Sequence, residues 1–492
     1  MRRPLVATVA VALLVVIPPA WAATIAGTRG ADRIVAHGNG TRDRISCGAG
    51  RDIVTADPDD RVAADCEVLS RQLSSDATTT AGAQHQTQVE PDSFAFDRTI
   101  VTAFQSGRYD DGGAAAIGWA TSRDAGASWA RGFLTLTTPR ASDPAVAYDA
   151  IHGVWLISIL SIAGPTLGMQ VARSPDGIRW STPVTVAEGT LPSAGYDKEW
   201  VACDNWPASP FRGRCYLSSL SLANDQLETR WSGDGGVTWS GPAITSVGVP
   251  SASEANGAIP VPRPDGSLVV GFLVAPSRGG APGPFIGATR SIDGGVTFSA
   301  VTSVAPLGLE PDQVPGMRAP PLPSLDVDAS GRVYASWHDC NFFTDCLAMD
   351  IVLATSADGV TWSTPTRVPT RNVDDRTDEF VPGLAVEPTS GRLAIAYYSL
   401  RQGGCAQSDC AGLNVSVIQS ADRGATWGRP QRLNAEPMRL SWIADTNLGR
   451  MVGDYISTSW VGGRAVPVFS MASAPEATGI GRQSVFAGSR LG

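Results

Sequence analysis

Histidine is scarce in this chain, and the motifs of metal, thiol-redox and nucleotide chemistry are missing. The 492 residues contain four histidines, and these form neither a metal cluster nor a catalytic triad: His37, His85, His152 and His338. No CxxC pair occurs, and no phosphate-binding glycine loop occurs outside predicted turns. These absences argue against a zinc enzyme, a thiol oxidoreductase and a nucleotide-dependent enzyme.

Charge, helical periodicity and long apolar runs are also limited. Charged residues make up 17% of the chain and the net charge is −9, so nucleic acid is not an expected partner. No long segment repeats apolar residues at the helical period, so we expect very little helix. The apolar run over residues 5–17 is too short to span a bilayer, and no other segment could. We therefore expect no membrane span, and we expect a monomer.

The first 22 residues have the features of a secretory signal. Arg2 and Arg3 form a basic start, an apolar stretch follows, and Ala20, Trp21 and Ala22 supply an A-x-A cleavage site. We predict cleavage after Ala22 and a secreted, extracellular protein.

An even number of cysteines agrees with export, because disulfides persist in oxidising compartments. Proximity in the sequence favours four local bridges: Cys47–Cys66, Cys203–Cys215, Cys340–Cys346 and Cys405–Cys410. Other pairings remain open in principle. Zinc is the competing interpretation, but only His338 lies near a cysteine pair.

One short motif occurs six times, with the common form S-x-D-x-G-x-[ST]-[WF]. The copies occupy residues 122–129, 174–180, 232–239, 291–298, 356–362 and 420–427. The aspartate can accept hydrogen bonds from backbone amides that follow it, and glycine supplies a positive φ. The closing aromatic can then pack into the apolar interface between neighbouring sheets. Each copy therefore predicts a tight turn with a structural role.

This motif is the Asp box, and the chain resembles the sialidase-like (BNR repeat) β-propellers. Successive aspartates are 52 to 65 residues apart, which leaves room for a four-stranded blade and loops. The resemblance implies an all-β propeller over residues 89–492, with each Asp box joining the third strand of a blade to the fourth. Segments before the first copy and after the last bring our count to seven blades. Six, as in sialidases proper, is the alternative.

Residues 23–70 differ in composition from the rest of the chain, and they resemble the glycine- and aspartate-rich repeats of RTX-type parallel β-rolls. In that family aspartates bind calcium in the turns while apolar residues fill the core. The resemblance implies calcium ligands at Asp32, Asp43 and Asp52, although arginines crowd the same turns. The alternative is a bare β-roll cap held by Cys47–Cys66. Residues 71–88 are polar and lack strand patterning, which predicts a linker.

In the resembling sialidases the active site lies on the propeller axis. Three arginines hold a substrate carboxylate, a tyrosine activated by a glutamate is the nucleophile, and an aspartate is the acid/base. Carried to this chain, these roles fall to Tyr455 (nucleophile), Glu199 (its base), Asp143 (acid/base), Arg318, Arg401 and Arg450 (carboxylate clamp), with Lys198 and Trp200 also contacting substrate. The family's opening [FY]-R-I-P motif is replaced here by VEPDSFAF, which has no arginine.

Two functions from different classes follow. The first is a secreted glycoside hydrolase of exo-sialidase type that acts on an extracellular glycan or glycoprotein. The second is a non-catalytic propeller that binds carbohydrate or protein, in which the same polar residues line a wet central channel. Convergence of the three arginines with the Tyr455–Glu199 pair on the axis would favour the first.

Overall fold

The computed structural model describes residues 23–75, 78, 80–249, 253–276, 283–308, 314–372, 375–401, 411–475 and 482–490. The predicted signal (residues 1–22) and the predicted Cys405–Cys410 bridge lie outside these ranges. In the described part, strands dominate and helix is limited to two 3-10 turns: η1 (Thr344–Cys346) and η2 (Leu440–Trp442). No helix among the described residues is long and apolar enough to cross a membrane.

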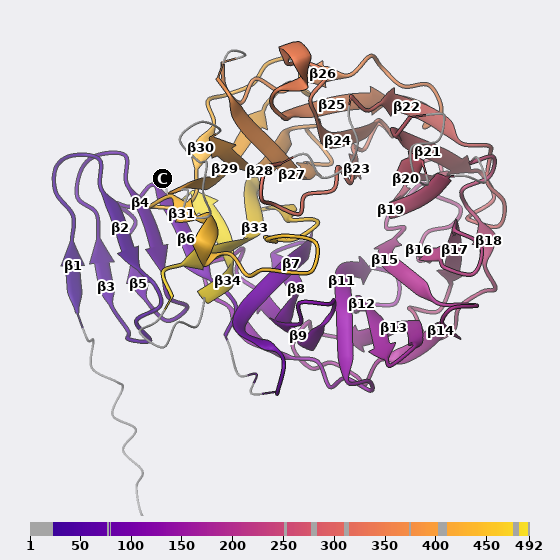
Figure 1. Cartoon of the computed structure of the whole chain (residues 1–492), viewed down its shortest axis with the longest axis horizontal. Coiled ribbons are helices and arrows are strands. Elements are labelled where there is room, and N and C mark those ends of the chain that lie inside the picture. The colour runs from indigo at the N-terminus through magenta and orange to yellow at the C-terminus, as the bar shows by residue number, and fades with distance from the viewer. Residues whose placement is uncertain are drawn as a thin grey trace, which may run out of the picture.

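Four-stranded antiparallel sets of strands stand around a ring, with one inner strand of each set facing the axis (Figure 1). Each set runs from its inner strand outward in chain order. The first three sets comprise β7 (Gln84–Phe96), β8 (Thr99–Arg108), β9 (Ala114–Ser122) and β10 (Ala130–Phe133); β11 (Arg140–Asp149), β12 (Val154–Ala163), β13 (Thr166–Ser174) and β14 (Val184–Thr190); β15 (Tyr196–Cys203), β16 (Cys215–Ser221), β17 (Gln226–Ser232) and β18 (Ala243–Ile244).

Three further sets repeat this order. They comprise β19 (Ser253–Pro262), β20 (Leu268–Pro276), β21 (Phe285–Ser291) and β22 (Thr302–Pro306); β23 (Ser324–Val327), β24 (Val333–Asp339), β25 (Asp350–Ser356) and β26 (Thr366–Arg367); β27 (Thr377–Val386), β28 (Leu393–Arg401), β29 (Ala411–Ser420) and β30 (Gln431–Arg432), with β31 (Met438–Arg439) also on β29. The predicted all-β propeller fold is confirmed by this arrangement.

The last set is built from both ends of the described chain. Its first three strands are β32 (Ser457–Val461), β33 (Arg464–Ser473) and β34 (Arg482–Arg490). Its outer strand is β6 (Val68–Gln72), which pairs antiparallel with β34. The ring is therefore closed by a strand that precedes β7 in the sequence.

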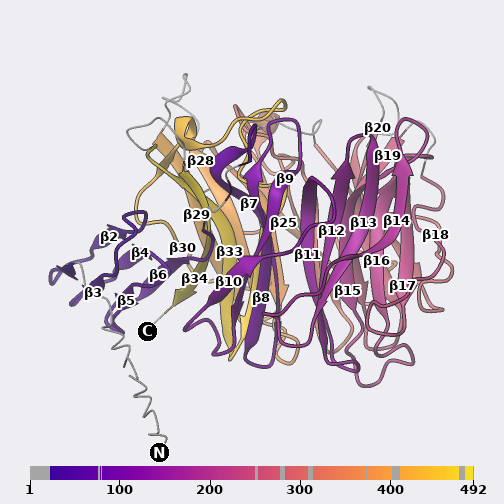
Figure 2. The same ribbon diagram turned by 90° about the horizontal axis from the view of Figure 1, so that it is seen from below.

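The N-terminal residues form a small roll of two parallel sheets beside the ring (Figure 2). One sheet holds β1 (Thr24–Ala26), β3 (Arg44–Ser46) and β5 (Arg61–Val62), and the other holds β2 (Arg33–Ala36), β4 (Ile53–Ala56) and β6. Apolar side chains fill the space between the sheets, among them Ile45, Val54 and Leu69. Successive short strands thus alternate between two stacked sheets.

The boundary between the roll and the ring differs from the sequence-based one. β6 belongs to both parts, because it pairs with β4 on one side and with β34 on the other. β7 begins at Gln84, inside the segment that we predicted to be a linker over residues 71–88. The polar composition of that segment was misleading because an outer strand and the start of an inner strand both tolerate polar side chains.

The six Asp boxes form the predicted turns. Each Asp-box aspartate accepts hydrogen bonds at 2.7 to 3.1 Å from backbone amides two to four residues further along the chain. The aspartates are at positions 124, 176, 234, 293, 358 and 422. The closing aromatics are half-buried, and each packs against a different apolar cluster: Trp129, Trp180, Trp239, Phe298, Trp362 and Trp427. The boxes therefore act as structural turns that anchor each set to the core.

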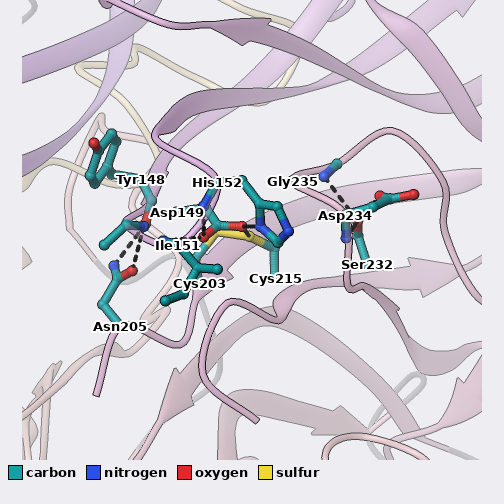
Figure 3. Close-up of a disulfide and its surroundings, with 12 residues drawn as sticks. Tyr148, Asp149, Ile151, His152, Cys203, Asn205, Cys215, Ser232, Asp234 and Gly235 are labelled. Atoms are coloured by element: carbon teal, nitrogen blue, oxygen red, sulfur yellow. Dashed lines mark hydrogen bonds and ion pairs between the residues drawn. A yellow bond between two sulfur atoms is a disulfide. The ribbon is translucent and has the colours of Figure 1, made fainter. Parts of the chain in front are cut away.

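Three of the four predicted disulfides are confirmed. They join Cys47 to Cys66, Cys203 to Cys215 and Cys340 to Cys346. Figure 3 shows the Cys203–Cys215 bridge, which links opposite residues of β15 and β16. Beside it, the buried carboxylate of Asp149 lies 2.6 Å from Nδ1 of His152 and accepts the amide of Ile151 at 2.9 Å. All three bridges are local, as the short spacings required.

Candidate functional site

Three neighbouring inner strands carry a bulge at the same place, near their N-terminal ends. The bulges in β7, β11 and β15 hold Glu90, Asp143 and Lys198, with φ of 53°, 47° and 52°. Left-handed backbone is costly for such residues and is found where surrounding structure enforces it, often at functional sites. Gly257 and Val381 occupy the corresponding bulges of β19 and β27. The bulge is thus a feature of the fold, and only three neighbouring positions give it charged side chains.

These bulges bring charged side chains from distant parts of the chain together on the axis. The Nζ of Lys198 lies 3.1 Å from Asp143 and 3.5 Å from both Glu90 and Asp454. Asp454, just before β32, also accepts two hydrogen bonds from Arg318, at 2.9 and 2.5 Å. A lysine ammonium has three N–H groups, which matches the three carboxylates around it. We call Glu90, Asp143, Lys198, Arg318 and Asp454 the axial charge cluster.

Burial and neighbouring charges shift the pKa values of Glu90 and Asp454 in opposite directions. Burial, opposed by Lys198 and reinforced by Asp143 and Asp454, raises the pKa of Glu90 to about 7. Burial would also raise the pKa of Asp454, but Lys198 and Arg318 outweigh it and hold that pKa below its ordinary value. Near neutral pH, one buried carboxyl can therefore carry a proton while its neighbour stays ionised.

The cluster forms the floor of a cavity of about 820 Å³ at the N-terminal ends of the inner strands. We call it the polar axial cavity. Besides the cluster, two further arginines line it: Arg108 and Arg140. Arg140 pairs with Asp111 at 2.7 Å, and Arg108 donates to the carbonyl of Tyr109 at 2.6 Å. The buried Nε of Arg108 has no hydrogen-bond partner among the described residues.

Three of the sequence-predicted site residues meet in this cavity: Asp143, Lys198 and Arg318. The other two predicted clamp arginines do not line it. Arg401 ends β28 opposite Thr377, and Arg450 precedes the cluster, where its carbonyl accepts the amide of Arg318 at 2.7 Å. The arginines that line the cavity are Arg108, Arg140 and Arg318, so one of the three predicted clamp arginines, Arg318, is among them.

The predicted pair of Tyr455 and Glu199 is not formed. The hydroxyl of Tyr455 donates to the carbonyl of Pro144 at 3.1 Å, and its ring lies beneath Lys198, with Nζ 4.4 Å from the ring centroid. The carboxylate oxygens of Glu199 are buried and have no hydrogen-bond partner among the described residues. Burial is the largest cause that raises the pKa of both groups well above the ordinary values. The tyrosine hydroxyl is therefore engaged with the backbone and makes no hydrogen bond to its predicted base.

Trp200 also lies away from the polar axial cavity. Its ring contacts that of Tyr455, with the centroids 5.0 Å apart. Both residues line a second, apolar cavity on the other side of the axial charge cluster. Adjacent residues of a strand face opposite ways, and the bulge at Lys198 determines which of them faces the polar axial cavity. Sequence alone did not reveal that phase.

Sequence reasoning assigned no role to Glu90 or Asp454, although two signals were present. Lys198 is the only lysine in the chain, among 37 arginines, which marks its position as one that requires a compact ammonium. The bulge residues Glu90, Asp143 and Val381 each precede a proline. A residue before proline has restricted backbone freedom, so this recurrence at one place in successive inner strands could have identified the bulge.

The aspartates predicted to bind calcium hold the coils of the roll together. Asp52 accepts the amide of Asp32 at 2.7 Å, and Asp43 accepts the amide of Ala23 at 3.0 Å. Asp32 accepts the amide of Thr28 at 2.5 Å within its own turn. In the described part of the chain, no group of three or more histidine, cysteine, aspartate or glutamate side chains is arranged to hold a metal ion. Calcium binding at these positions stays a prediction.

Comparisons with known proteins concern the fold only. No family model and no curated protein matches this chain. A protein of unknown function from Dyadobacter fermentans is 18% identical, with coverage of 67% of this chain and 94% of that one and a TM-score of 0.44. The leech intramolecular trans-sialidase is 14% identical, with coverage of 66% and 67% and a TM-score of 0.44. The phage phi92 endosialidase is 11% identical, with coverage of 95% and 75% and a TM-score of 0.47.

Proposed function

We propose that this chain is an exported propeller that binds an extracellular glycan in the polar axial cavity and hydrolyses a glycosidic bond there. The axial charge cluster carries this proposal. Its carboxylates and cations line a cavity of a size that suits a small ligand, and polyhydroxylated ligands need many charged or polar partners. The Asp-box resemblance and the all-β fold support the same class of ligand.

The chemistry assigned to the cluster uses two carboxyl groups in place of a tyrosine. Glu90, whose pKa is raised to about 7, donates its proton to the oxygen of the glycosidic bond as that bond breaks. Asp454, which stays ionised beside Arg318 and Lys198, stabilises the positive charge that develops on the sugar ring. Water then adds to the sugar, and its proton returns to Glu90.

The location outside the cell rests on two supports. Residues 1–22 have the pattern of a secretory signal, and the described cysteines are all paired in disulfides. Expression of the full chain with its first 22 residues, followed by mass spectrometry of the culture medium, tests this: the mature protein should begin at Ala23. Retention of an uncleaved chain in the cell would contradict it.

A panel of sialylated, uronic-acid and neutral oligosaccharides tests the site. Glu90→Gln should lower turnover by at least about 100-fold, because the amide cannot supply the proton, while glycan binding measured by calorimetry persists. The matched control is Asp111→Asn, which alters an exposed carboxylate of the same cavity and should leave both unchanged. The glycan proposal fails if the wild-type chain binds no member of the panel.

One observation favours a non-catalytic alternative. Asp143 and Asp454 are already engaged in ion pairs, and Tyr455 makes no hydrogen bond to Glu199. A propeller that only binds glycan would use the same cavity, and its signature is binding without turnover in the wild-type chain. Equal turnover by wild type and Glu90→Gln would remove Glu90 from the mechanism.

A further inference from the structure

A second cavity lies on the axis, beyond the axial charge cluster. Its volume is about 440 Å³, and seven inner strands of the described chain contribute residues to it: β7, β11, β15, β19, β23, β27 and β32. We call it the apolar axial cavity. Lys198 and Asp454 are shared with the polar axial cavity, so the charge cluster separates the two spaces.

Aromatic rings and prolines both contribute to the wall of the apolar axial cavity, alongside aliphatic and hydroxyl side chains. Five half-buried aromatic side chains line it: Phe94, Phe96, Trp200, Trp206 and Trp460. Six prolines also line it, and proline contributes no backbone N–H: Pro207, Pro260, Pro262, Pro323, Pro382 and Pro388. Inner strands are sheet edges, where unpaired donors would otherwise face the channel. The prolines therefore make this wall poor in hydrogen-bond donors.

The polar groups in this wall are already bonded within the protein. Asp92 accepts the amide of Val146, and Asp326 accepts the amide of Val386, each at 2.7 Å. These two bonds join neighbouring sets of strands across the channel wall.

Two of the three wall tryptophans have their indole N–H engaged within the protein. The indole of Trp206 donates to Pro262 at 2.8 Å, and that of Trp460 donates to Ala385 at 3.2 Å. Both tryptophans therefore present carbon surface to the cavity. Water held there would find few partners, which makes such a space favourable for an apolar guest.

The charged groups of this wall are paired or partly neutralised within the protein. Lys198 and Asp454 line the cavity and pair with each other at 3.5 Å, and the Nζ of Lys198 also lies over the ring of Tyr455. Burial raises the pKa of Asp92 to about 7 and that of Asp326 to about 6, despite their backbone hydrogen bonds. The two carboxyls therefore carry less negative charge near neutral pH than exposed aspartates would. The wall thus gives a charged ligand little advantage over an uncharged one.

We infer that the apolar axial cavity is a second binding site, separate from the glycan site, for an uncharged apolar molecule with an aromatic or aliphatic body. Its aromatic wall, its bonded polar groups and its volume carry this assignment. The site does not depend on the proposed hydrolysis, because its wall residues lie on the far side of the charge cluster.

The test measures binding of N-phenyl-1-naphthylamine to the full chain. This uncharged dye fluoresces strongly in an apolar environment. The expected result is saturable binding at one dye per chain, with energy transfer from tryptophan. Ile259→Trp places a large ring in the cavity from β19 and should weaken dye binding at least about tenfold. The matched control, Ile292→Trp, makes the same change at a side chain that is 75% exposed in an Asp-box turn, and should leave binding unchanged.

A second filling variant guards against misfolding of the first. Ala202→Trp enters the same space from β15, and the two filling variants should agree. Absence of saturable dye binding to the wild-type chain would overturn the inference. So would equal dye binding by wild type, Ile259→Trp and Ala202→Trp, because the dye would then occupy another surface. Glycan binding is not part of this readout, so either proposal can fail without the other.

Discussion

Replacement of the single lysine by methionine should destabilise the protein in a pH-dependent way. Lys198→Met removes an ammonium that lies within 3.1 to 3.5 Å of three buried carboxylates: those of Glu90, Asp143 and Asp454. Removal of one partner from a buried ion pair typically costs about 3–5 kcal/mol, because the remaining charge is left uncompensated. We expect a loss of this size in the free energy of unfolding at pH 8.

The stability loss caused by Lys198→Met should become smaller as the pH falls. Without Lys198, which lowers the pKa of Glu90 in the native protein, the folded-state pKa of Glu90 rises further above that of the unfolded chain. Groups with raised folded pKa values contribute stability at low pH that is lost as the pH rises through those values. Glu90 has a pKa of about 7 even with the lysine in place, so the change should develop between about pH 5 and pH 8.

Urea unfolding followed by tryptophan fluorescence at pH 5, 6.5 and 8 measures this effect. The control is Arg140→Met, which removes a cation from the same cavity whose partner, Asp111, is 61% exposed. Exposed pairs contribute about 0–1 kcal/mol, so that variant should change stability little at any of these pH values. A loss below about 1 kcal/mol for Lys198→Met at pH 8, or an equal loss at pH 5 and pH 8, would refute the reasoning.

Three further predictions concern the scaffold. Trp239→Ala should lower the free energy of unfolding by about 3 kcal/mol. The reason is the void that it leaves against the apolar cluster between the second and third sets of strands. A change of less than about 1 kcal/mol would contradict this packing role. Peptide mapping without reduction should recover Cys405 joined to Cys410, and a free thiol at either position would disprove the bridge. Millimolar calcium should raise the unfolding midpoint of the roll, and Asp43→Asn should remove the response; an unchanged midpoint would leave these aspartates as backbone acceptors only.

The sequence predicted features that depend on residues close together in the chain. An Asp box contains its acceptor, its amides and its aromatic within eight residues, so the turn could be identified from the motif alone. The three described disulfides close loops with sequence separations of 6 to 19, and proximity identified each pair. The alternation of turns and β-branched runs likewise indicated an all-β fold.

The site was harder to predict because its residues are far apart in sequence and depend on strand phase. Lys198 and Asp454 are 256 residues apart, and no local pattern indicates that they meet. The bulge at Lys198 also decides that this side chain, and not Glu199, joins the cluster. Adjacent residues of a strand lie on opposite faces, which explains why Lys198 lines the polar cavity while the next residue, Glu199, does not.

The shared strand β6 has a consequence for how the protein is made. β6 occupies residues 68–72, yet its partner in the last set, β34, ends at residue 490. The ring cannot close until almost the whole chain has been synthesised. Until then one edge of the N-terminal roll's sheet is unpaired and open to pairing with another chain. Folding of this protein should therefore be sensitive to crowding among nascent copies, and truncation near the C-terminus should leave the same edge permanently exposed.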